Sequence, residues 1–247
     1  MNQLNVKSPW LGVAGVVMAG LILSTTIFTT GLVKYKTPGS SITVTGSAKR
    51  EIKSDWIVWS GTYSFQSPNL TEAYKSLVEN RNKVKAYFTS KGIAEKELIF
   101  SSVSTTVNKE ILPNGGYSNK VESYSLSENV EIRSNDVGKI TEISREATEL
   151  INQGVEFQSN PPQYFYTKIA DLKVEMLTLA TKDAFNRAKQ IAENAHSNIG
   201  SLRSAKQGVF QITPLYSNEI SDYGINDTSS MEKEITAVVN CSFNIEK

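Results

Sequence analysis

The sequence contains little of the chemistry by which an active site is usually recognised. Its one histidine, His196, and its one cysteine, Cys241, lie far apart, which argues against a zinc site or a Cys–His nucleophile pair. One cysteine also excludes an intramolecular disulfide. No glycine-rich phosphate-binding or dinucleotide-binding motif is present. We therefore expect no catalytic residue, no bound metal and no cofactor.

An excess of charge of either sign is also missing. The 26 basic and 25 acidic residues give a net charge of +1 and are mixed along the chain. A nucleic-acid-binding protein would show a basic excess, so we expect no nucleic-acid partner.

A few polar positions are weak candidates for chemistry, and each has a simpler interpretation. His196 falls at the end of a predicted helix, where it faces solvent and the helix dipole. Residues 46–50 ("GSAKR") suggest anion binding only weakly, because they lead into a strand rather than a helix. Cys241 shares the apolar face of a predicted strand and is expected in the core. Four glutamates form pairs that we interpret as solvated helix surface, namely Glu142/Glu146 and Glu72/Glu79.

The N-terminal stretch of residues 9–33 is apolar and carries no charge. As a helix, residues 8–33 would extend about 39 Å, enough to cross a hydrocarbon core of about 30 Å. The stretch is longer than the apolar region of a secretory signal and lacks a clear small-x-small cleavage site. These features favour an uncleaved membrane anchor; a cleaved signal and a buried helix stay open. Lys7 on one side and Lys34 and Lys36 on the other do not settle its orientation.

Small residues recur at helical spacing within this stretch, at Gly12, Gly15 and Ala19. Such spacing lets two transmembrane helices approach closely, which makes these residues candidates for helix packing. The simpler interpretation is that small residues are common in transmembrane helices.

The remaining chain alternates between strand and helix patterns. Apolar periodicity and turn residues predict paired strands in 41–67, a helix over 69–92, a hairpin turning at 113–116, a helix over 135–152, two short strands around Pro161-Pro162, a helix over 171–196, and strands over 204–213 and 234–245. Residues 216–232 are polar and turn-rich and predict a mobile loop. Helices between pairs of strands predict an α+β fold, with mainly antiparallel sheets and helices packed on them. The αββα segment predicts a ferredoxin-like second lobe.

Two prolines followed by an aromatic run form the most unusual local stretch. Its residues are Pro161, Pro162, Tyr164, Phe165 and Tyr166. One interpretation is core packing with an edge strand protected by proline. Because aromatic residues are enriched at interfaces, the same residues are candidates for an oligomer contact. A small-ligand pocket is the third alternative.

Two segments resemble the signatures of SIMPL-domain proteins. The stretch "ITVTGSAKREIKSDWIVWSGTYS" is similar to an opening hairpin of the form [IV]-x-V-x-G-x-[AG] followed by a long apolar strand. The segment from Tyr164 to Gly208 resembles a second signature, a strand followed by an alanine-rich helix. Its pattern A-x-x-x-A-x-x-[IL]-A fits Ala184, Ala188, Ile191 and Ala192, and Gly200 fits the glycine before the next strand. The residues "ENAHSNIG" are more polar than the family pattern. The resemblance covers about residues 41–246.

The resemblance implies an α+β fold of two intertwined lobes, export to the bacterial envelope, ring- or cage-like homo-oligomers and an association with oxidative stress. The family has no established catalytic residues to carry over. We predict an anchor or signal over 1–33, a linker over 34–40 and a SIMPL domain over 41–246. Lobe 1 would comprise about 41–133 and 204–246, and lobe 2 about 134–203.

Two main hypotheses for function follow. The first is a non-enzymatic, single-pass protein of the bacterial inner membrane, with its C-terminal domain in the periplasm or otherwise outside the cytoplasm. Its partners would be other copies of itself and membrane lipid, contacted through residues 9–33. The alternative is a periplasmic binding module with a ligand or partner near the aromatic run or the 216–232 loop. A cryptic enzyme and a cytoplasmic adaptor are further alternatives.

Overall fold

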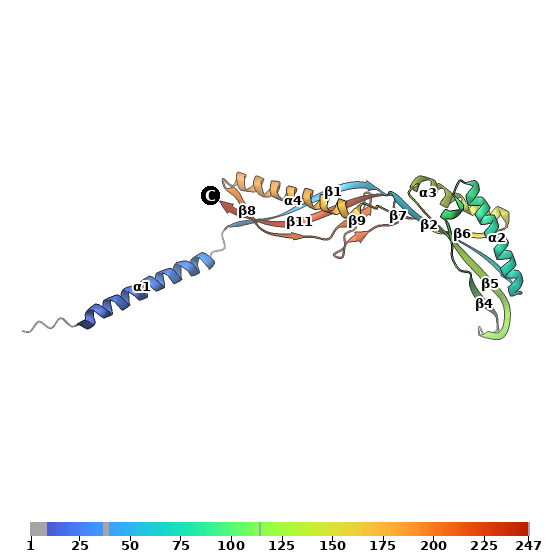
Figure 1. The fold of residues 1–247 in the computed structure, drawn as a ribbon, viewed down its shortest axis with the longest axis horizontal. Coiled ribbons are helices and arrows are strands. Elements are labelled where there is room, and N and C mark those ends of the chain that lie inside the picture. The colour runs from blue at the N-terminus through green and yellow to red at the C-terminus, as the bar shows by residue number, and fades with distance from the viewer. Residues whose placement is uncertain (1–8, 37–39, 114, 247) are drawn as a thin grey trace, which may run out of the picture. The chain divides into compact units, whose positions relative to one another are not determined.

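The computed structural model describes residues 9–36, 40–113 and 115–246. Within α1, the surroundings of the side chains are described only for residues 13–29. Figure 1 shows the elements. They are α1 (Pro9–Lys36), β1 (Ser41–Lys53), β2 (Trp56–Ser67), α2 (Leu70–Ser90), η1 (Glu95–Glu97), β3 (Leu98–Phe100), β4 (Ser104–Ile111), β5 (Tyr117–Ser134), α3 (Val137–Glu146), η2 (Ala147–Gln153), β6 (Glu156–Ser159), β7 (Gln163–Phe165), α4 (Ile169–Asn194), β8 (Asn198–Gln207), β9 (Gln211–Pro214), β10 (Ile225–Asn226) and β11 (Glu232–Glu246). The predicted α+β class is confirmed.

The described residues fall into two compact units. The first takes them from Met1–Gly46, Thr181–Gln207 and Val239–Lys247, and the second from Ser47–Ala180 and Gly208–Val238. Strands β1 and β11 and helix α4 contribute residues to both units. The residue ranges of these units differ from the ranges of the two predicted lobes. The lobe boundaries stay a prediction.

The first unit has an alanine-lined helix against antiparallel strands. Its part of α4 buries Ala184, Ala188 and Ala192, at the four-residue spacing of one helix face. Phe185 meets Phe243 of β11 edge to face, with ring centroids 5.9 Å apart. Cys241 is fully buried on β11 and is a free thiol whose pKa burial raises, as expected for a core residue.

The second unit contains a sheet in the order β3–β5–β2–β6, with β4 also paired to β5 and β7 to β2. All of these pairings are antiparallel. Helices α2 and α3 both pack on β2 and β5. The connection β2–α2–β3–β5–α3–β6 in this strand order is a ferredoxin-like motif, which therefore spans residues 56–159.

The sequence predicts a ferredoxin-like lobe over residues 134–203, but the structure forms this motif over residues 56–159. Strand β6 pairs with residues 61–64 of β2, and β7 pairs with residues 56–58 of the same strand. Pro161 and Pro162 lie between them and have no amide hydrogen, so they interrupt the pairing without ending it. The two short strands thus belong to the sheet that contains β2 and β5.

Local sequence signals set the ends of α2. The side chain of Asn69 accepts hydrogen bonds from the amides of Thr71 and Glu72, which caps the first turn. Glu72 accepts a hydrogen bond from the Ser67 hydroxyl at 2.8 Å. Gly92 ends the helix with a φ of 79°, a left-handed conformation that favours glycine.

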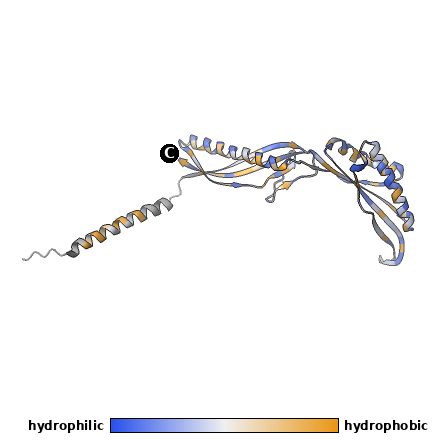
Figure 2. Ribbon diagram, in the orientation of Figure 1, coloured by the Kyte–Doolittle hydropathy of each residue, from blue (hydrophilic) through white to orange (hydrophobic). Residues whose placement is uncertain are grey.

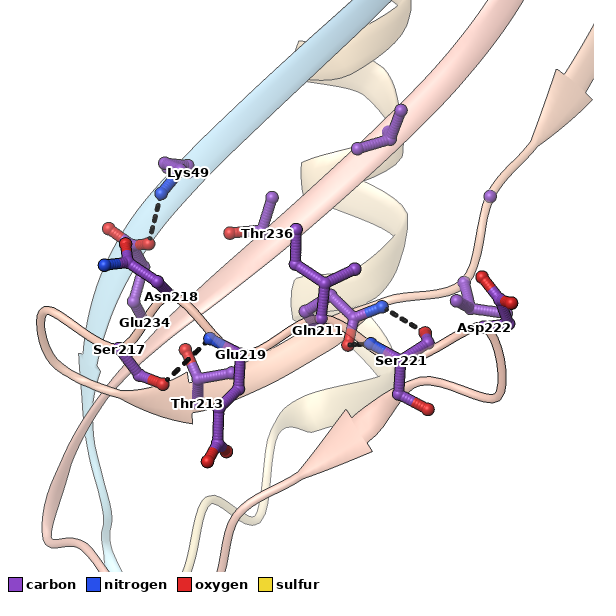
Figure 3. A pocket seen from close by; sticks show the side chains of 14 residues that line it. Lys49, Gln211, Thr213, Ser217, Asn218, Glu219, Ser221, Asp222, Glu234 and Thr236 are labelled. Carbon is purple, nitrogen blue, oxygen red and sulfur yellow. Dashed lines mark hydrogen bonds and ion pairs between the residues drawn. The ribbon is translucent and has the colours of Figure 1, made fainter.

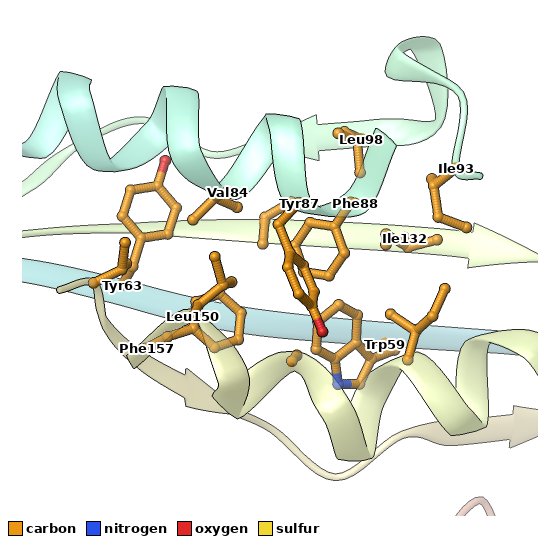
Figure 4. Packing of buried hydrophobic residues seen from close by; sticks show 14 of the residues in the cluster. Trp59, Tyr63, Val84, Tyr87, Phe88, Ile93, Leu98, Ile132, Leu150 and Phe157 are labelled. Atoms are coloured by element: carbon orange, nitrogen blue, oxygen red, sulfur yellow. The ribbon is translucent and has the colours of Figure 1, made fainter. Parts of the chain in front are cut away.

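Aromatic rings fill the space between the sheet and the helices of the second unit (Figure 4). Trp59 of β2 meets Phe88 of α2 edge to face at 5.5 Å, and Phe157 of β6 packs against both rings. Gly61 gives the Phe157 ring room, because a Cβ at position 61 would lie 2.2 Å from its Cζ atom. The glycine is therefore part of the core packing.

Residues 9–36 form helix α1, so the predicted N-terminal helix is present. Figure 2 shows its apolar composition, and its described large apolar side chains, from Val13 to Phe28, are exposed. Among the described residues, however, no helix is both long and apolar enough to cross a membrane. The transmembrane part of the predicted fold is not confirmed.

The core packing predicts opposite effects for two glycine substitutions. Gly61→Ala should lower the free energy of unfolding by about 1–3 kcal/mol, because the Phe157 ring must move. Gly138→Ala in α3 meets no atom within 4 Å and should raise it by up to about 1 kcal/mol, through helix propensity. Guanidinium unfolding of both variants checks this; equal effects would contradict the packing.

Candidate functional site

A pocket of about 440 Å³ lies in the second unit, between the sheet residues of β9 and β11 and the loop that joins β9 to β10 (Figure 3). We call residues 215–224 the β9–β10 loop. The lining residues are Lys49, Gly208, Val209, Gln211, Thr213, Ser217, Asn218, Glu219, Ile220, Ser221, Asp222, Glu234, Thr236 and Val238. Strands therefore supply one side of the pocket and the loop supplies the other.

The β9–β10 loop is held by hydrogen bonds, which differs from the mobile loop that the sequence predicts. The amide of Gln211 donates to the Ser221 carbonyl at 2.7 Å and its oxygen accepts from the Ser221 amide at 3.4 Å. The Ser217 hydroxyl accepts from the Glu219 amide, and Gly224 turns the chain with a φ of 83°. A side-chain amide on a strand thus ties the loop to the sheet.

Several polar groups that line the pocket have no bonding partner among the described residues. The hydroxyl of Thr213 is the clearest case, since that residue is only 4% exposed. The hydroxyl of Thr236 and the carboxylates of Glu219 and Asp222 are also without a partner within the described ranges. Glu219 and Asp222 are exposed, Thr236 is half-buried, and the Thr213 hydroxyl is not among the buried side-chain atoms that lack a partner, so these groups are open to a ligand at the pocket surface.

The charges around the pocket favour a cationic ligand. Lys49 lies 2.7 Å from Glu234, so these two charges offset each other. Glu219 and Asp222 leave two unpaired negative charges on the loop side. The weak suggestion of anion binding at "GSAKR" receives no support, because Lys49 is paired with Glu234 and Arg50 forms a bidentate pair with Glu175 at 2.5 and 2.6 Å.

A buried lysine fixes the segment that follows the pocket loop. Lys233 is 2% exposed and donates to the carbonyl of Tyr164 at 2.7 Å and to the carbonyl of Asp227. Burial lowers the pKa of Lys233, and the Asp227 carboxylate partly opposes this shift. Burial alone would raise the pKa of Asp227, but hydrogen bonds from Ser229 and Ser230, with the charge of Lys233, lower it.

The aromatic run lies partly in the core of the second unit. Tyr164 is 8% exposed in β7, and its hydroxyl lies 3.2 Å from that of Thr141. Phe165, Tyr166 and Pro162 are half-buried, and Pro161 is exposed. The two prolines line a second pocket of about 560 Å³. The core interpretation is confirmed for Tyr164, and the oligomer contact stays a prediction.

None of the other candidates is among the residues that line the pocket. Gly15 and Ala19 are exposed on α1, and Gly12 lies outside the residues whose surroundings are described. His196 is exposed and has a φ of 54° just after α4. The four glutamates are exposed; Glu146 pairs with Lys91 at 2.8 Å. No group of His, Cys, Asp or Glu among the described residues could hold a metal ion.

One buried ionic cluster serves the fold of the second unit. Glu128, 2% exposed on β5, accepts two hydrogen bonds from the Arg81 guanidinium at 2.5 and 2.8 Å. It also accepts one from the hydroxyl of Tyr63. Burial, followed by the hydrogen bond and charge of Glu128, raises the pKa of Tyr63. None of these residues lines a described pocket.

The raised pKa of Tyr63 predicts a loss of stability at alkaline pH. Above the usual tyrosine pKa of about 10, the unfolded chain ionises this hydroxyl while the folded chain keeps its proton. The free energy of unfolding should then fall by about 1.4 kcal/mol per pH unit from this group. Below pH 10 both states hold the proton, so the contribution is fully present.

Tyr63→Phe should therefore weaken the alkaline slope, measured by guanidinium unfolding from roughly pH 8 to 11. Tyr117→Phe is the matched control, because Tyr117 is 73% exposed. An unchanged slope in Tyr63→Phe would contradict the assignment.

The pocket was only partly visible in the sequence. The sequence indicates the 216–232 segment as a possible binding region. It does not single out Thr213, Thr236 and Gln211 as binding residues, because polar residues on strands are common. Spacings such as Ser217-x-Glu219, Ser221-x-Tyr223 and Asp227-x-Ser229 could have indicated an ordered loop, since serine and aspartate accept bonds from the amide two residues later.

Comparison with known proteins gives one result for the family. The model of the SIMPL family, described as a protein of unknown function (DUF541), matches residues 42–243, which is most of the chain. No curated protein matches the chain.

Proposed function

The chain belongs to the SIMPL family, and from that membership and the pocket we propose that it is a non-enzymatic binding protein. The observation that supports this proposal most directly is the pocket beside the β9–β10 loop. There the hydroxyl of Thr213, a residue only 4% exposed, has no hydrogen-bond partner in the described part of the chain. A volume of about 440 Å³ suits a small molecule or one or two side chains of a partner.

The arrangement favours binding over catalysis. Catalysis of acyl or phosphoryl transfer needs a nucleophile, a base and a charge-stabilising group within hydrogen-bond reach of one another. The pocket instead presents scattered hydroxyl and carboxylate groups, and its one cation is paired with Glu234. Such groups can orient a ligand through hydrogen bonds.

A thermal-shift screen with amines, amino acids and sugars tests this function. A ligand at about 100 times its Kd should stabilise the protein by about 2.7 kcal/mol, which raises Tm by several degrees. Thr213→Val should remove the shift, because it deletes the free hydroxyl with little change in volume. Thr105→Val, on the exposed strand β4, is the matched control. A screen without any hit, or hits that persist in Thr213→Val, would contradict the pocket.

Self-assembly at a membrane is a second candidate, favoured by two exposed surfaces. Residues 104–113 and 115–122 of the β4–β5 hairpin are largely exposed, including Val107, Ile111 and Tyr117. The large apolar side chains of α1 are exposed as well. A second copy on the hairpin and lipid on α1 would cover these surfaces, with the folded units outside the cytoplasm. The periplasmic location, ring- or cage-like form and link to oxidative stress are parts of this proposal.

The intact mass and oligomeric state of detergent-extracted full chain test the second candidate. We expect a homo-oligomer of chains that retain residues 1–33, and a shift to smaller species in Ile111→Lys/Tyr117→Lys. Val174→Lys, at a similarly exposed position on α4, should leave the size unchanged. A strict monomer that begins near residue 34 would contradict the proposal.

A further inference from the structure

Three large side chains of the β9–β10 loop are almost completely exposed. Tyr223 is 98% exposed, Tyr216 is 90% exposed and Ile220 is 84% exposed. These are the highest exposures among the large hydrophobic residues described in the chain. Aromatic side chains that gather on one surface segment are typical of the central contacts of protein interfaces.

The loop presents these side chains from a fixed backbone. Gln211 ties Ser221 to the sheet, and the Ser221 hydroxyl accepts a hydrogen bond from the Tyr223 amide at 3.3 Å. Tyr216 has a φ of 63°, a left-handed conformation that costs a non-glycine residue about 1 kcal/mol or more. A preorganised loop loses less conformational entropy when a partner binds.

The charges between the exposed side chains define the chemistry of the partner. Glu219 and Asp222 flank Ile220 closely in sequence, and neither carboxylate has an ion-pair partner within the described ranges. Both line the pocket together with the buried Thr213, whose hydroxyl is also free there. Figure 3 shows the side chains of Glu219 and Asp222 pointing apart from opposite ends of the loop, so one basic head group would pair with one of these carboxylates. The Thr213 hydroxyl offers a further hydrogen-bond acceptor in the same pocket.

We propose that the β9–β10 loop docks a protein segment in which a lysine or arginine is flanked by aromatic or aliphatic side chains. The basic side chain enters the pocket and pairs with one of the two carboxylates, Glu219 or Asp222. The flanking apolar side chains cover Ile220 and the two tyrosines. This inference rests on the proposed binding function, because it assigns an occupant to the same pocket. A free amine would meet only the pocket, whereas a peptide would also cover the loop.

A random peptide library displayed on phage and selected on the detergent-solubilised full chain tests the proposal. We expect the enriched peptides to carry Lys or Arg next to aromatic or aliphatic residues. Synthetic copies should bind at least tenfold more weakly to Glu219→Lys/Asp222→Lys and to Ile220→Ser. Their affinity for the natural sequence should also fall with added salt.

Matched controls are Glu142→Lys on α3 and Val174→Ser on α4, both at exposed positions, and both should bind the peptides as the natural sequence does. Enrichment of acidic or uncharged peptides, no enrichment, or equal binding to the loop variants would overturn the proposal. If a small ligand still stabilises the chain through Thr213 in that case, the pocket function stands and only the protein partner is wrong. Loss of both would remove the proposed function as well.

Discussion

The buried ammonium group of Lys233 is the constraint on which the surroundings of the site depend. An ammonium removed from water costs several kcal/mol unless nearby groups replace its hydration. The carbonyls of Tyr164 and Asp227 do so, and Asp227 holds the following turn through Ser229. One side chain of β11 therefore links β7 to the segment after β10, close in sequence to the end of the pocket loop.

The ionic groups of the second unit divide by their surroundings into structural and available ones. Glu128 is compensated by Arg81 and Tyr63 inside the core, where it orders α2 against β5. Glu219 and Asp222 stand on a loop whose own hydrogen bonds do not use their carboxylates. Only carboxylates of the second kind can change partner at low cost, which supports the proposed binding at the loop. The Glu128 cluster stabilises the fold instead.

Most elements could be predicted from the sequence, because apolar periodicity and caps act within a few residues. The Asn69 cap and the β4–β5 hairpin are examples. Strand pairing could not be predicted in the same way. The sequence predicts β6 and β7 as two short strands around two prolines but does not give their partner. Both pair with β2, which is long enough to pair with each in turn. The ferredoxin-like motif consequently spans 56–159 instead of 134–203.

The sequence by itself determined the α+β class, the family, the N-terminal helix and the low content of catalytic residue types, since these depend on composition and local pattern. Only the tertiary structure decided that Thr213 and Thr236 face a pocket, that Lys49 is paired with Glu234, and that a seemingly featureless loop is ordered. These facts depend on contacts between residues far apart in the chain, such as positions 49 and 234. Local periodicity carries no information about such contacts.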